Sequence, residues 1–222
     1  MPKPTFLQLP DEKRQRFTHA ALVEFTDHSY DVASVSRLVS TLGIAKGSLY
    51  QYFGDKFELF EWLLQESGRR KVQAIEAGLA PDPEADVLAR LRQMYWHGLA
   101  FWQAEPRWAS LGLRVHEPSR EPRLAALRQA VALGAHAFVR GLLAEGQSTG
   151  QLRADVPLDA TAHLVTSLLS VGLRDALLAK VGLAPGTLPD HPLDVRDADL
   201  EQIVNATMGL LERGLQRPEP SG

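Results

Sequence analysis

The stretch "TLGIAKGSLYQYFGDK", residues 41–56, decides how the N-terminal part of this chain folds. Gly43 separates two short segments with helical spacing, and Gly54 ends the second of them. In that second segment, Lys46 to Phe53, the apolar Leu49 and Phe53 share one side. Glycine at position 47 lowers helix stability by about 1 kcal/mol relative to alanine. So short a helix is not stable alone, which indicates that its outward face contacts another molecule. That face carries Lys46, Gly47, Ser48, Tyr50 and Gln51.

Segments on both sides of this stretch also have helical spacing. Apolar residues recur every four positions from 17 to 25 and predict a helix from Asp11 to Thr26. Ser34 can cap a second helix that ends at Gly43, and "DKFE" (55–58) has capping-box spacing for a longer helix. Two short helices joined by a glycine turn and braced by a third form a helix-turn-helix, whose second helix enters the DNA major groove.

The rest of the chain continues with helical spacing, and no run alternates apolar and polar residues as a strand does. We therefore predict an all-α protein. A three-helix helix-turn-helix DNA-binding domain is expected over residues 1–56, and a larger helical domain over residues 57–222. The last two helices are expected near 158–180 and 197–215.

Composition limits the classes of function. Residues 1–56 carry a net charge of +1 and the remaining residues −4, so the N-terminal part is the better suited to approach phosphates. The N-terminus has no apolar core of secretory length, and no later run reaches the roughly 18 uninterrupted apolar residues of a membrane span. We expect a cytoplasmic protein with no membrane partner.

Catalytic and metal-binding patterns are missing from the sequence. The chain has no cysteine, which excludes disulfides, thiolate zinc sites and cysteine nucleophiles. The histidines at 97, 116, 136 and 163 lack metal-ligand spacing, and neither a glycine-rich phosphate loop nor a Gly-x-Ser-x-Gly elbow occurs. We expect no enzyme activity, no metal and no cofactor.

The segment "SVSRLVSTLGIAKGSLYQYFGDKFELF" (34–60) closely resembles the DNA-binding region of the TetR (tetracycline-repressor-like) family of transcriptional regulators. The resemblance covers roughly residues 10–65. A weaker likeness lies in "AEGQSTGQLRADV" (144–156), which is similar to a link before the family's penultimate helix.

This resemblance implies roles for individual residues. Lys46, Gly47, Ser48 and Tyr50 would face base edges or adjacent phosphates, together with Gln51 on the same outward face. Tyr52 and Lys56 would hold phosphates, as would Ser34 and Ser36 near the start of the preceding helix. Two positions depart from the family pattern: Ala45 lacks a capping hydroxyl, and Ser29 stands where a glycine is usual.

The C-terminal part resembles the family's ligand-binding and dimerisation domain. Residues 164–178 are apolar nearly all round, so we expect them to be buried both in their own core and against a second copy. The alternative is that the last two helices are simply internal. A two-fold homodimer through these helices predicts a pseudo-palindromic operator in double-stranded DNA, with half-sites about 34–36 Å apart or somewhat further.

An aromatic cluster over residues 94–108 suggests a pocket for a small apolar or aromatic effector. The candidate lining residues are Trp96, His97, Phe101 and Arg174, although the same aromatics would also suit a core. The function predicted is a sequence-specific DNA-binding regulator, a repressor released from its operator by the effector. The alternative is a helical ligand-binding or scaffolding protein that no longer reads DNA.

Overall fold

The computed structural model describes residues 1–78, 86–180, 182 and 197–216, and these residues are mostly helical. Within them the backbone forms no β-ladder beyond a single antiparallel bridge between Leu152 and Gln216. The prediction of an all-α fold is confirmed. The chain forms two compact units, one made of residues 1–72 with 105–129 and the other of most of the remainder. The expected functional boundary at residue 56 stays a prediction.

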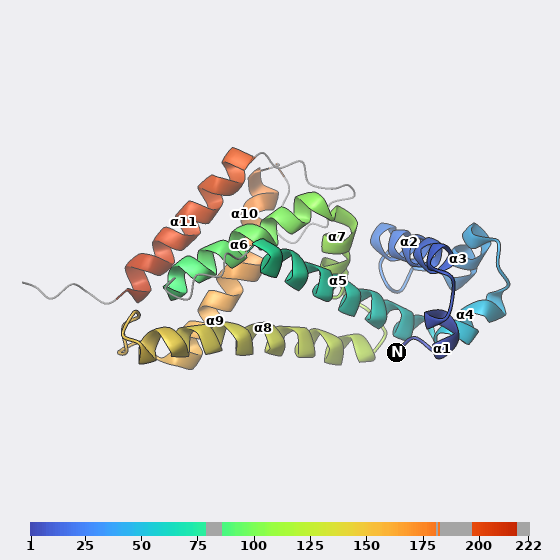
Figure 1. Ribbon diagram of the computed structural model, residues 1–222, viewed down its shortest axis with the longest axis horizontal. Coiled ribbons are helices and arrows are strands. Elements are labelled where there is room, and N and C mark those ends of the chain that lie inside the picture. The colour runs from blue at the N-terminus through green and yellow to red at the C-terminus, as the bar shows by residue number, and fades with distance from the viewer. Residues whose placement is uncertain (79–85, 181, 183–196, 217–222) are drawn as a thin grey trace, which may run out of the picture. The chain divides into compact units, whose positions relative to one another are not determined.

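The first unit contains the predicted helix-turn-helix. Its elements are α1 (Pro4–Leu7), α2 (Asp11–Asp27), α3 (Val35–Leu42), α4 (Lys46–Tyr52), the first part of α5 (Lys56–Gly78), α7 (Pro106–Arg114) and the start of α8 (Arg123–Ser148). Helices α2, α3 and α4 match the predicted ranges to within about one residue. Helix α1, which lies against α4 (Figure 1), was not predicted, because a single turn with one buried residue shows no periodicity.

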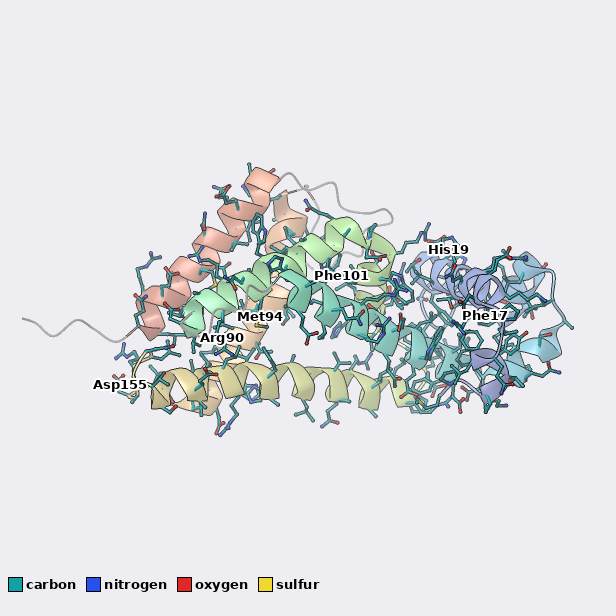
Figure 2. All side chains as sticks on the ribbon, in the orientation of Figure 1. Phe17, His19, Arg90, Met94, Phe101 and Asp155 are labelled. Carbon is teal, nitrogen blue, oxygen red and sulfur yellow. The ribbon has the colours of Figure 1, made fainter. Side chains whose placement is uncertain are left out.

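Aromatic rings form the centre of the first unit. The Phe6 ring lies 5.4 Å from Phe17, 5.0 Å from Phe53 and 5.0 Å from Trp62, measured between centroids. Figure 2 shows Phe17 within this dense group of side chains. Edge-on and tilted ring pairs of this kind stabilise a core beyond the apolar area that they bury. They tie together α1, α2, α5 and the end of α4.

The turn between α3 and α4 depends on Gly43, whose φ of +66° lies in the left-handed region. The N–H of Gly43 donates to Ser40 O (3.1 Å) and the N–H of Ile44 to Val39 O (3.0 Å). This is a Schellman ending, which satisfies the last carbonyls of a helix and favours glycine at the left-handed position. The direction in which the chain enters α4 is therefore set by one glycine.

Glu24 of α2 holds the beginning of α3. Its buried carboxylate accepts hydrogen bonds from the Ser34 N–H (2.7 Å) and from Arg37 Nη2 (2.6 Å). Burial alone raises the pKa of the Glu24 carboxyl, but the bonds from Arg37 and the Ser34 N–H outweigh it, so the pKa is lowered. The start of α3 is thus fixed by a charge on α2, in addition to the predicted Ser34 cap, whose Oγ accepts from the Arg37 N–H (3.3 Å).

Helix α7 is joined to the end of α2 by arginines. Arg107 Nη1 donates to Asp27 Oδ1 (2.8 Å) and to Thr26 Oγ1 (3.0 Å), while Arg114 Nε donates to Thr26 O (3.1 Å). Cations at a helix C-terminus offset its dipole. Residues beyond position 57 therefore brace the helix-turn-helix directly.

The second unit is a helical bundle. It contains α6 (Val87–Ala104), most of α8, α9 (Leu158–Ser167), the π-helical turn η1 (Leu168–Gly172), α10 (Leu173–Lys180) and α11 (Asp197–Leu215). Helix α11 packs along α6 and α10 (Figure 1), and Arg92 of α6 donates to Glu212 Oε1 of α11 (2.9 Å). The two predicted final helices are confirmed, with a π-helical turn interrupting the first.

The stretch Leu158–Lys180 is long and apolar enough to cross a membrane by length and composition alone. It is not an uninterrupted apolar run, since Asp159, Arg174 and Asp175 lie within it. Core helices of soluble proteins share this composition, so the finding is weak evidence for a membrane segment.

The role of Glu24 gives a first prediction. We expect Glu24→Gln to lower the free energy of unfolding at pH 7 by about 1–3 kcal/mol, because the charge-assisted bonds to Arg37 are lost. A group whose pKa is lowered by folding stabilises above its unfolded pKa and loses that contribution as pH falls through the folded value. The difference in the free energy of unfolding between variant and wild type, measured with urea, should therefore shrink below about pH 4. A constant difference from pH 7 to pH 3 would contradict this account.

Candidate nucleic-acid interface

Helix α4 has the two faces that the sequence predicted. Leu49 and the C-cap residue Phe53 are fully buried, whereas Lys46, Gly47, Tyr50 and Gln51 are exposed and Ser48 is half-buried. In the described part of the chain, no carboxylate pairs with the Lys46 ammonium. The outward face of α4 thus combines one uncompensated positive charge with hydroxyl and amide groups, which are the groups that contact phosphates and base edges.

Gly47 is not required by the fold around it. No atom lies within 4 Å of the position that a Cβ would occupy, and its backbone is helical. The helix therefore carries the cost of a glycine without an internal reason, which agrees with close approach of an outside group. Ala45, the N-cap residue, provides no side-chain bond to α4, as expected for this departure from the family pattern.

The residues predicted to contact phosphates differ in how exposed their side chains are and in whether their polar groups are already hydrogen-bonded. Ser36 of α3 is exposed, but the hydroxyl of Ser34 already caps α3. Tyr52 is half-buried, with its ring 5.8 Å from Phe6 and 5.4 Å from Phe17, so much of its side chain belongs to the core.

Lys56 is occupied inside the protein. Its Nζ donates to Tyr30 O (2.8 Å) and Ala33 O (3.1 Å) and lies 4.4 Å from the centroid of the Tyr30 ring. Burial lowers the pKa of its ammonium group. The ammonium has three protons, so at most one is left for a phosphate. In this structure Lys56 chiefly orders the turn between α2 and α3, and its contact with DNA stays a prediction.

Several residues at this site were missed by sequence reasoning. Arg16 Nη2 donates to Leu42 O (3.2 Å) at the end of α3, and Glu24 and Arg37 fix its start. Lys3 and Thr5 contact the last turn of α4. Bonds between residues so far apart in sequence leave no periodic signal, although a charged residue such as Glu24 on the inner side of α2 is an anomaly that could have been noticed.

Three of the predicted effector residues lie on α6, and a pocket lined by them stays a prediction. Phe101 is buried (2% exposed; labelled in Figure 2), whereas Trp96 is 37% exposed. The His97 ring lies against Gly78, where a Cβ would come within 2.2 Å of it. Arg174 lies in α10, and its side chain is outside the described part of the structure. A hollow of about 160 Å³ is lined instead by Asp86, Val87, Leu88, Gln151, Leu152 and Gln216.

Known proteins share both the helix-turn-helix and the whole fold. Residues 17–63 match the family described as "Bacterial regulatory proteins, tetR family". The HTH-type transcriptional repressor AcnR of Corynebacterium jeikeium is 27% identical over 190 residues, which are 84% of this chain and 90% of the relative. AcnR of Corynebacterium efficiens is 26% identical over 177 residues, 76% of this chain and 83% of that protein.

Solved structures agree with these relatives. The crystal structure of a TetR family transcriptional regulator from Chloroflexus aurantiacus superimposes with a TM-score of 0.74 at 28% identity, covering 98% of this chain and 100% of the other. The fatty acid degradation regulator FadR of Bacillus halodurans shares the fold, with a TM-score of 0.66 at 19% identity over 88% of this chain and 97% of its own. With a helix-turn-helix whose outward face suits DNA, and relatives along most of its length, this chain belongs to the TetR family of DNA-binding transcriptional regulators.

Proposed function

We propose that this protein is a cytoplasmic repressor that binds a pseudo-palindromic operator as a homodimer and is released by a small apolar or aromatic effector. The observation that carries the proposal is the outward face of α4, a short helix braced on its inner side and left open on the other. The AcnR relatives, which are named as transcriptional repressors, support repression rather than activation.

Within this proposal, α4 is the recognition helix. Lys46, Gly47, Ser48, Tyr50 and Gln51 face the major groove, where lysine and amide side chains read base edges. Ser34, Ser36 and Tyr52 hold phosphates that fix the register of the helix on the duplex. Lys56 contributes positive charge close to the phosphate backbone of the DNA, and it orders the turn before α3. The DNA-binding domain is taken as residues 1–56 and the effector and dimerisation domain as residues 57–222.

The dimer forms through the last two helical stretches. Ala162, Val165 and Leu177 are buried in the second unit, but on the other side of the same stretch Leu164 is 72% exposed. Leu210 of α11 is 59% exposed. An exposed apolar strip on helices that are already packed on one side is typical of a subunit interface. A two-fold dimer presents two copies of α4, spaced for half-sites about 34–36 Å apart or somewhat further.

Effector release requires a coupling free energy of about 1–3 kcal/mol between the two sites. Helix α5 is the candidate lever, because its first turn follows α4 directly and its last residues belong to the second unit. The effector would contact the neighbourhood of Trp96, His97, Phe101 and Arg174. The chemical class of the effector, small and apolar or aromatic, is inferred from the aromatic residues of α6 alone.

The proposal is tested first by selecting duplexes from a random pool with the full chain. We expect an enriched palindrome whose affinity falls steeply with salt, with a logarithmic slope near −0.9 for each phosphate contact. Scrambled duplex of the same length is the control. The missing cap at Ala45 and the small charge of the N-terminal part favour a scaffold as the second candidate, and a folded dimer that enriches no sequence would support that scaffold instead.

The roles of two lysines can be separated. We expect Lys46→Ala to relax preference at specific operator positions and lower operator affinity by roughly 1–3 kcal/mol, since a base contact is lost. Lys56→Ala should weaken operator and scrambled duplexes alike, because a positive charge close to the phosphates is lost. Fluorescence anisotropy with both duplexes measures this. Equal effects of the two variants on both duplexes would contradict the division of roles.

The dimer interface gives a further prediction. Leu164→Glu and Leu210→Glu each place two charges in a two-fold interface, one from each copy, which costs several kcal/mol. We expect monomers in sedimentation velocity at micromolar concentration and at least a 100-fold loss of operator affinity. Leu133→Glu on α8, 58% exposed, is the matched control and should stay dimeric. Dimers that persist in both interface variants would rule out this interface.

A further inference from the structure

We infer that Lys3 and Thr5 are positioning residues for DNA recognition, which cap the C-terminal end of the recognition helix from outside it. They belong to the N-terminal arm, defined here as residues 3–9, which lies beside α4 (Figure 1). The inference rests on the proposed role of α4, and it concerns how that helix is held rather than which bases it meets.

The argument begins with the carbonyl groups at the end of α4. The last four carbonyls of any helix have no partner within it. The chain satisfies the first of these four itself, since the Phe53 N–H donates to Leu49 O (2.8 Å). Phe53 is extended, with φ −133° and ψ 156°, so α4 has no left-handed glycine ending like that of α3. Three carbonyls remain, those of Tyr50, Gln51 and Tyr52.

The N-terminal arm provides a donor for every one of these three groups. Lys3 Nζ donates to Tyr50 O (2.7 Å), and the Lys3 N–H donates to Tyr52 O (2.8 Å). Thr5 Oγ1 donates to Gln51 O. All four carbonyls at the end of α4 are therefore hydrogen-bonded, three of them by residues more than forty positions away in the sequence.

Charge favours the same arrangement. Helix α4 has no basic residue of its own in its last turn. The Lys3 ammonium supplies a cation at the negative end of the helix dipole, where a lysine would stabilise the helix. For a helix of seven residues, whose formation in isolation is unfavourable, such an external cap contributes a large part of its order.

The arm is itself firmly anchored. Phe6 is fully buried among Phe17, Phe53 and Trp62. Arg14 Nη1 donates to Leu7 O (3.0 Å), which connects the arm to α2. Pro4 restricts the backbone between Lys3 and Thr5. Because the arm is fixed to the core, it transmits a defined position to the end of α4.

Two of the capped carbonyls belong to Tyr50 and Gln51, whose side chains face outward. Loss of a cap would therefore let the last turn of α4 fray where it meets the major groove. Operator affinity should fall, whereas binding to scrambled DNA, which depends mainly on phosphates, should not.

The test uses the full chain with Thr5→Val, which keeps the side-chain shape and removes the donor, and Lys3→Met, which keeps an unbranched stem and removes the charge. Hydrogen exchange of the DNA-free protein is measured first. Amides of residues 49–53 should exchange about 3- to 10-fold faster, as expected for one lost hydrogen bond, while those of α11 stay unchanged. Thr149→Val is the matched control, since Thr149 Oγ1 also donates to a helix carbonyl, Glu145 O (3.0 Å), but in the second unit.

Operator and scrambled duplexes are then compared at two salt concentrations. We expect operator affinity to fall about 3- to 10-fold for Thr5→Val and Lys3→Met, with scrambled binding and the salt slope unchanged. Thr5→Ser should restore both exchange and affinity.

Four results would overturn the inference. Unchanged exchange at residues 49–53 would show that the arm does not hold α4, whatever the DNA results. Faster exchange with unaltered operator affinity would reduce the cap to a purely structural one. A salt slope lowered by about 0.9 in Lys3→Met would make Lys3 a direct phosphate contact. If the wild-type protein showed no sequence preference, the proposed function would be wrong, and with it the role of the arm in DNA recognition. The exchange data on the DNA-free protein would still show whether the arm holds α4.

Discussion

The structure depends on keeping a seven-residue helix in place. Helix α4 can bury only Leu49, with Phe53 just beyond its end, and so short a segment does not hold a helical conformation in water. Its order must come from its surroundings. Gly43 sets its entry, the aromatic group around Phe6 holds its inner side, and the N-terminal arm completes its end. The outer face of the helix therefore stays available for the proposed contact with DNA, because its order comes from its inner side and its two ends.

The same unit extends beyond the helix-turn-helix. Arg107 and Arg114 of α7 bond to the end of α2, and in the loop before α8 the Arg120 N–H donates to Asp31 Oδ2 (3.0 Å). At the first residue of α8, Arg123 Nη1 donates to Asp55 Oδ2 (2.8 Å) at the start of α5. These bonds surround the turn before α3 and the beginning of α5. A movement of α7 or of the start of α8 would therefore reach the helix-turn-helix as directly as a movement of α5, which gives the proposed effector release a second physical route.

The sequence predicts the structure well where that structure follows from the spacing of neighbouring residues. The ranges of α2, α3 and α4 and the glycine turn at Gly43 are properties of neighbouring residues, and the sequence predicted them closely. It failed where distant residues meet. The arm on α4, Glu24 at the start of α3 and the inward turn of Lys56 depend on tertiary contacts that no periodic pattern records. The outer face of α4 was predictable, because it consists of the residues left over once the apolar ones are assigned to the core. The lining of an effector pocket was not, because it depends on which helices pack against each other.

The charge of the N-terminal part gives a physical reason for the proposed homodimer. Glu24 neutralises the charge of Arg37, whereas the ammonium groups of Lys56 and Lys3 donate to backbone carbonyls and keep their charge. Residues 1–56 carry a net charge of only +1, so the non-specific attraction of one copy to DNA, which is mainly electrostatic, is weak. Linking two DNA-binding domains in a dimer makes the second binding event intramolecular, which raises the overall affinity without any new contact. A DNA-binding domain that relied on such pairing would discriminate well, because only a duplex with two correctly spaced half-sites would engage both proposed recognition helices.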